Sequence, residues 1–185
     1  MKMRWIGVVA ASLTAGCAPT MRSAPAPVEA TDAAVYATVL DLFAGGPIVL
    51  VDSLDVVDAG GDVYGAVSRV AGKTLADDLV RRGSDSRVVP ASLPTRNAVR
   101  IIRGRDVASR SPDDLEALWR EFSERHPGAA GYFQVSAVGY DRDATRAVLY
   151  VGHRCGMLCM QGYIMTLARE GNGWKVLDYP ILWEA

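Results

Sequence analysis

The sequence predicts an α+β domain in which N-terminal helices pack on one face of a C-terminal antiparallel β-meander. Two features of the chain carry this prediction. Before position 128 the clearest apolar patterns recur three and four residues apart, as on one face of a helix, whereas from position 131 apolar and polar residues alternate. The alternating segments are joined by short turns, which favours antiparallel strands that follow one another in sequence.

The first folded element is expected to be a helix that begins at Thr31. The Thr31 hydroxyl can cap a helix, and Asp32 suits the positive end of the helix dipole. Gly45-Gly46-Pro47 would end this helix. The elements that follow are expected in this order: a buried strand over 47–54, a short strand over 64–69, a weaker helix over 71–82, a loop over 83–98 and a strand over 98–104.

The clearest helix is expected over 111–128. Ser111 can cap it and Pro112 fits its first turn, while apolar residues at 115, 118, 119 and 122 share one face. Four strands should follow over 131–141, 145–153, 161–170 and 173–183. Asn172-Gly173 between the last two is typical of a tight hairpin turn.

The N-terminus predicts a bacterial lipoprotein. Residues 1–16 read as a signal peptide, because a charged start precedes an apolar run that is too short to span a membrane permanently. Leu13-Thr14-Ala15-Gly16-Cys17 resembles a lipobox, so Cys17 is expected to carry the lipid. Ala18 after the cysteine, by resemblance to Gram-negative sorting rules, favours the outer membrane and a periplasm-facing domain. Residues 17–30 are rich in Pro and Ala and predict a tether, which leaves 31–185 as one domain.

Charge and motifs exclude several classes of function. Residues 69–110 carry ten Lys or Arg, which leaves two interpretations open: a surface for anionic lipid or a glycan polymer, or a solvated surface that pairs with the acidic first third. Because no aromatic residue lies between Tyr64 and Trp119, a nucleic-acid partner is not expected. Asp52, Asp55, Asp58 and Asp62 do not have the spacing of a calcium loop.

Cys155 and Cys159 are expected to form a disulfide. Lipidation of Cys17 leaves this even pair in a compartment that permits disulfides. Residues four apart on an extended strand lie about 13 Å apart, too far for a disulfide, so the bond requires a turn at Gly156-Met157-Leu158. Two other interpretations stay open. One is a redox-active dithiol, and the other is a zinc site that adds His153 and His126 to the two cysteines.

The segment AVLYVGHRCGMLC (147–159) gives the chain a resemblance to a family of small, uncharacterised bacterial secreted and lipoprotein domains. These domains share the motif Y-V-G-H-x-C-G-x-L-C, preceded by a helix that ends in Pro-Gly and by V-G-[FY]. The resemblance covers roughly residues 111–183. This chain has Cys159-Met160-Gln161-Gly162 where the family commonly has Cys-Gly-Glu-Gly. The family brings no activity, so the resemblance supports the fold unit alone.

The expected function is that of an envelope lipoprotein whose domain is a non-enzymatic, tethered binding or interaction module. No catalytic residue, metal or cofactor is assigned, and His153 is the one candidate for a functional polar side chain. The expected partners are the membrane, through the N-terminal lipid, and a protein or other envelope component. Whether the protein is an enzyme stays open. The alternative is a metal-dependent or thiol-redox enzyme that uses His153, Cys155 and Cys159.

Overall fold

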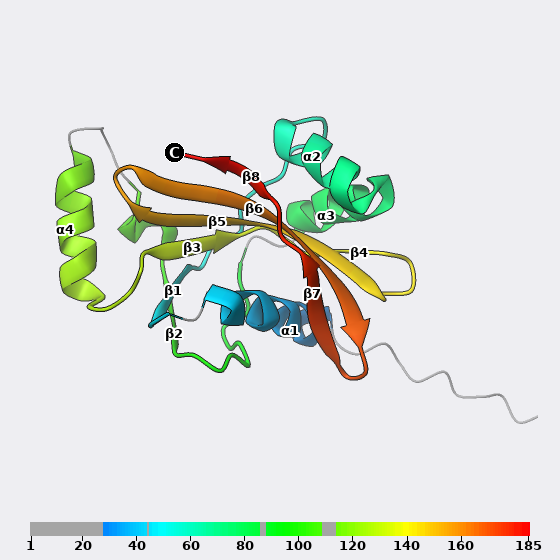
Figure 1. Cartoon of the computed structure of the whole chain (residues 1–185), viewed down its shortest axis with the longest axis horizontal. Coiled ribbons are helices and arrows are strands. Elements are labelled where there is room, and N and C mark those ends of the chain that lie inside the picture. The colour runs from blue at the N-terminus through cyan, green and yellow to red at the C-terminus, as the bar shows by residue number, and fades with distance from the viewer. Residues whose placement is uncertain (1–27, 44, 86–87, 109–113) are drawn as a thin grey trace, which may run out of the picture.

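The structure is a computed structural model that describes residues 28–43, 45–85, 88–108 and 114–185 (Figure 1). The predicted signal peptide, Cys17 and the predicted tether up to residue 27 lie outside the described residues, as do Ser111 and Pro112. No helix within the described ranges has both the length and the apolar character that crossing a membrane requires.

Within the described ranges, four helices and eight strands build an α+β fold, as the sequence predicts. The helices are α1 (Val28–Leu40), α2 (Asp62–Ala71), α3 (Lys73–Asp85) and α4 (Leu115–Arg125), with short 3-10 turns at Asp41–Phe43 and Gly104–Asp106. The strands are β1 (Ile48–Val51), β2 (Val99–Ile102), β3 (Tyr132–Val135), β4 (Gly139–Tyr140), β5 (Arg146–Gly156), β6 (Cys159–Glu170), β7 (Gly173–Asp178) and β8 (Ile181–Glu184).

The strands form one mixed sheet in the order β2-β1-β3-β5-β6-β7, with β4 paired to β5 and β8 paired to β6. The antiparallel pairing expected after residue 131 is confirmed, because the strands from β3 to β8 pair with one another in antiparallel fashion. Strand β1 lies parallel to both β2 and β3. The long connections that carry α2, α3 and α4 make these parallel pairs possible.

Helices cover both faces of the sheet, so the expectation that they share one face is wrong (Figure 1). Helix α1 packs on the face that carries Leu149 and Val151, whereas α2 and α3 pack on the face that carries Val148 and Ile164. Strand β5 is buried at six consecutive positions, from 147 to 152, and such a strand needs a cover on each side.

The expected strand over 64–69 is wrong, since these residues lie in α2. Its Ala66, Val67 and Ala71 are buried against the sheet, and this packing outweighs the strand preference of the valines. Gly72 ends the helix with a φ of 95°, a conformation that favours glycine. Helix α1 already runs through Thr31, so Thr31 is not its cap.

At Gly139, strand β4 approaches α3 closely. A Cβ atom at this position would lie 2.7 Å from Leu79 Cβ and 2.8 Å from the Leu79 backbone nitrogen. Because the helix backbone cannot give way cheaply, we expect Gly139→Ala to lower the free energy of unfolding by about 1–3 kcal/mol in urea denaturation.

Gly65→Ala is the matched control, because a Cβ at this position in α2 would meet only the end of the Arg69 side chain, at 3.5 Å. Alanine is favoured over glycine inside a helix, so this variant should be more stable by about 0.5–1 kcal/mol. Equal losses in the two variants would contradict the close approach at Gly139.

Candidate functional site

The long β5–β6 hairpin carries the motif that the sequence singles out. Its register runs from the pair Arg146 and Ala168 to the pair Gly156 and Cys159, with a shift between Arg154 and Gly156. Only residues 157 and 158 form the turn. The hairpin therefore projects its tip at one end of the sheet, on the left of Figure 1, while α1 begins near the opposite end.

A disulfide between Cys155 and Cys159 closes the tip, as the sequence predicts. Their Cα atoms lie 5.0 Å apart, because the turn brings the ends of the two strands together. The bond encloses a loop of only five residues, so its entropic stabilisation of the domain is about 2 kcal/mol. Its larger effect is to hold the turn in one shape.

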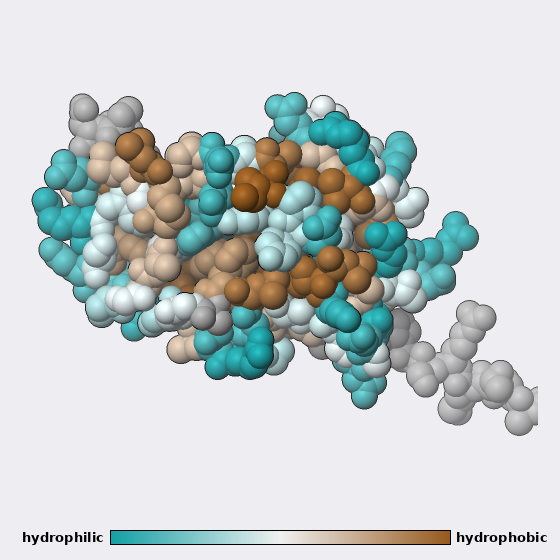
Figure 2. Space-filling view, in the orientation of Figure 1, coloured by the Kyte–Doolittle hydropathy of each residue, from teal (hydrophilic) through white to brown (hydrophobic). Residues whose placement is uncertain are grey.

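The turn exposes two large apolar side chains. Leu158 is 89% exposed, the highest value among the large apolar residues of the described chain, and Met157 is 46% exposed. Figure 2 shows hydrophobic surface at the end of the molecule where this hairpin turns. A second row of exposed apolar residues, Leu177, Tyr179 and Ile181, lies along β7 and β8.

His153 packs as an aromatic ring beneath the tip. It stacks on Phe133, with ring centres 4.3 Å apart and an angle of 7° between the planes, and it also contacts Phe43. Its Nε2 lies 3.2 Å from the Ala130 carbonyl oxygen, so Nε2 carries the proton and donates it. Burial lowers the pKa of His153, and the bond to Ala130 opposes this shift. These contacts favour a packing role for the ring.

The four residues of the hypothetical zinc site do not come together. His153 stacks on Phe133 on the face that α1 covers, whereas His126 at the end of α4 contacts Phe122 on the opposite face. The two cysteines are bonded to each other and offer no thiolate. Within the part of the chain that the structure describes, no three His, Cys, Asp or Glu side chains converge on a point that would hold a metal ion.

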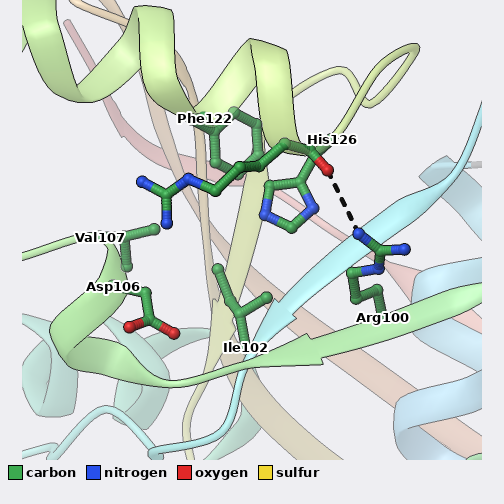
Figure 3. Close-up of a pocket in the computed structure, with 7 residues that line it drawn as sticks. Arg100, Ile102, Asp106, Val107, Phe122 and His126 are labelled. Carbon is green, nitrogen blue, oxygen red and sulfur yellow. Dashed lines mark hydrogen bonds between the residues drawn. The ribbon is translucent and has the colours of Figure 1, made fainter.

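His126 instead lines a small cavity of about 270 Å³ beside α4 (Figure 3). The ring lies beside Phe122 and faces Ile102, and an Arg100 guanidinium nitrogen donates to the Arg125 carbonyl oxygen at 3.2 Å. Burial, followed by the charges of Arg100 and Arg125, lowers the pKa of His126. The His126 Nδ1 is buried and has no hydrogen-bond partner, which suits a neutral ring.

Asp55 is a half-buried carboxyl that sequence reasoning did not select. Its backbone nitrogen donates to the Val135 carbonyl at 2.9 Å, which fixes the loop after β1 against β3. Burial raises the pKa of Asp55, and the Arg154 charge opposes this shift. The Asp55 carboxylate and the Tyr150 hydroxyl both lie within 4 Å of where a Gly152 Cβ would stand. No local sequence signal could reveal this group, since its members are about a hundred residues apart.

Two further acidic residues of that segment, Asp52 and Asp58, lie in separate surroundings. Asp52 accepts a hydrogen bond from the Gly104 backbone nitrogen at 3.0 Å and so ties β1 to the turn after β2. Asp58 is exposed next to the start of α2. Asp52 is therefore engaged within the fold, whereas Asp58 faces solvent.

Comparison of the chain with family models, curated proteins and solved structures found no match. The resemblance through the 147–159 motif therefore stays a prediction.

The disulfide gives the first prediction for this site. Trypsin should release the peptide from Cys155 to Arg169 whole, and without reductant its mass should be two hydrogens lighter than that of the dithiol. The Cys155→Ser/Cys159→Ser variant should fold with a free energy of unfolding about 2 kcal/mol lower in urea denaturation. Free thiols together with stoichiometric zinc in the intact protein would contradict this prediction.

The contacts of His153 predict a defined pH dependence. Its folded pKa lies below the ordinary value of 6.5, so the fold favours the neutral ring. Its contribution to stability is complete above the unfolded pKa and is lost as the pH falls from about 6.5 through the folded pKa. NMR titration should place the His153 ring below 6.5.

The corresponding stability measurement compares unfolding in urea at pH 7.5 and pH 5. Wild type should lose more stability on acidification than His153→Gln, because the variant lacks this titrating ring. His126→Gln is the matched control that reports the other histidine, whose pKa is lowered for a similar reason. A His153 ring that titrates at or above 6.5 would contradict the burial argument.

Proposed function

We propose that this protein is a bacterial envelope lipoprotein, held in the outer membrane by a lipid on Cys17, whose domain acts as a non-enzymatic binding module in the periplasm. The hairpin tip, defined here as Met157 and Leu158 with the Cys155–Cys159 disulfide, is its proposed contact surface. The occupant is a protein partner with an apolar pocket that receives Leu158. The observation that carries this proposal is the 89% exposure of Leu158 on a covalently closed turn.

The physical argument is the cost of exposure. An apolar side chain held in water forgoes about 1.5–3 kcal/mol of burial free energy. The disulfide limits how far the turn can fold back to hide Leu158, so the exposure is built into the fold. A preformed tip also loses little conformational entropy when it binds, which favours affinity.

The chemistry around the tip indicates what kind of pocket fits. Arg154 is exposed below the turn, and one of its guanidinium nitrogens lies 2.8 Å from the Met160 sulfur. A partner pocket with an apolar floor and acidic residues at its rim would complement Leu158 and Arg154 together. The tip and the start of α1 lie near opposite ends of the sheet (Figure 1).

Two experiments at position 158 test the proposal: crosslinking to find the partner, and a charge substitution to weaken its binding. A photo-crosslinking amino acid placed at 158 in the full, anchored chain should capture a defined envelope protein, and the same amino acid at exposed Val88 should not. With that protein purified, Leu158→Asp should raise the Kd by about thirtyfold, because binding would bury a charge at the centre of the contact.

Val88→Asp is the matched control, since Val88 is 66% exposed elsewhere on the surface. It should leave the Kd unchanged, and both variants should keep the wild-type Tm. The proposal is wrong if Leu158→Asp binds as tightly as wild type. Turnover of a substrate that His153→Gln abolishes, with binding unaffected by Leu158→Asp, would favour the enzymatic alternative.

A further inference from the structure

The other end of the domain holds a cleft of about 770 Å³. It lies where the first turns of α1, helix α3, the β4–β5 turn and the end of β6 meet, on the right of Figure 1. Four arginines line it, and we call it the arginine cleft: Arg81, Arg82, Arg142 and Arg169. It is separate from the hairpin tip and does not depend on the lipid anchor.

We propose that the arginine cleft binds the phosphate group of a small organic phosphate ester. Guanidinium groups recognise phosphate oxygens through paired, charge-assisted hydrogen bonds. The same chemistry is offered by a soluble phosphorylated metabolite and by a phospholipid headgroup, and the experiment below separates these two sources.

The acidic residues of the cleft already have partners within the fold. Asp78 accepts hydrogen bonds from Arg81 and from the Tyr140 backbone nitrogen. Asp77 accepts from Lys73 and from the Tyr64 hydroxyl. The negative charges of these two carboxylates are therefore balanced by neighbouring cations, and the carboxylates repel an incoming anion only weakly.

The third acid of the cleft, Asp141, is engaged in the β4–β5 turn. It accepts hydrogen bonds from the Thr145 nitrogen and hydroxyl and from the Arg146 nitrogen. These bonds lower the pKa of Asp141 against the opposing effect of burial, so it stays charged. Its role is to shape the turn that carries Arg142.

Two of the four guanidinium groups, those of Arg142 and Arg169, keep donors available. Arg142 is exposed and makes no hydrogen bond or ion pair with any described residue. The Arg169 guanidinium lies 5.9 Å from the Trp174 ring centre, which orients it without using its N–H groups. A phosphate between these two side chains would supply the missing acceptors.

Arg82 forms a rigid wall of the cleft. Its Nη2 donates to both Asp32 carboxylate oxygens at 2.8 Å, and its Nε donates to the Val138 carbonyl oxygen at 2.7 Å. These bonds leave Nη1 unused. The guanidinium also lies 5.0 Å from the Tyr140 ring centre, so its position is fixed before any ligand binds.

The size of the cleft favours an ester over inorganic phosphate. A volume of about 770 Å³ lies within the range of about 300–1,000 Å³ that is typical of small-molecule sites. The Tyr140 ring and the hydrocarbon stems of the arginines add apolar surface beside the charged groups. We therefore expect the organic part of the ligand to contribute to binding along with its phosphate.

Calorimetric titration of the full chain tests the site, with Cys17→Ser introduced so that the protein carries no lipid. The soluble probe is glucose 6-phosphate, and the lipid probe is dihexanoyl phosphatidate below its micelle concentration. At least one should bind with a Kd below about 1 mM, and its phosphate-free counterpart should bind at least about tenfold more weakly. Which probe binds more tightly identifies the source of the phosphate. Tighter binding of inorganic phosphate than of both esters would overturn the assignment to an organic ester.

Variants of the cleft arginines test whether the phosphate ester binds in the cleft. Arg142→Ala and Arg169→Ala should each raise the Kd by about tenfold, since each removes charge-assisted hydrogen bonds. Arg120→Ala is the matched control, because Arg120 is an exposed arginine on distant α4. The inference is overturned if neither phosphate ester binds, or if the two cleft variants bind no more weakly than Arg120→Ala. Arg82 is left unchanged because it also holds α1 to α3.

Discussion

Burial of β5 on both faces is the constraint on which the rest of the structure depends. Its side chains alternate between two apolar clusters, so Leu149 and Val151 face α1 while Val148 and Tyr150 face α2 and α3. Each fully buried large apolar side chain stabilises the fold by about 1.5–3 kcal/mol. Neither apolar face of such a strand can be left exposed to water without losing this stabilisation. The helices must therefore divide between the two faces of the sheet.

The two helix layers are tied together at the edge of the sheet. Arg82 on α3 and Asp32 on α1 form an ion pair in which the side chains are only 17% and 19% exposed. The Tyr140 hydroxyl donates to the same carboxylate at 2.8 Å. Burial raises the pKa of Asp32, while Tyr140 and Arg82 oppose that shift. Removing one partner would leave a partly buried charge without its counter-ion, so the pair opposes separation of α1 from α3.

The same β5–β6 ladder separates two surfaces with different chemistry. One end carries the apolar hairpin tip, and the other carries the arginine cleft (Figure 1). Eleven residues of β5 span about 36 Å at about 3.3 Å per residue. A rigid, doubly covered ladder holds these surfaces at a constant distance, so a small phosphorylated ligand and a protein partner would occupy the domain without competing for space.

The sequence by itself determined the features that depend on neighbours along the chain. The alternation after residue 131 and the turn residues Gly171-Asn172-Gly173 predict the antiparallel hairpins, and the four-residue spacing of Cys155 and Cys159 predicts a disulfide across a turn. Turn chemistry and strand periodicity are local, which is why these predictions are confirmed. The prediction that Cys17 carries a lipid rests on an equally local motif, but Cys17 lies outside the described residues.

Only the tertiary structure decided which segments meet. Residues 64–69 are helical because they cover Val148 and Ile164 from a distant part of the chain. The arginine cleft draws Arg82 and Arg169 from elements 87 positions apart in sequence, and the separation of His126 from His153 depends on which face α4 covers. Packing of this kind follows from the free energy of burying whole surfaces against each other, and no local pattern of residues encodes it.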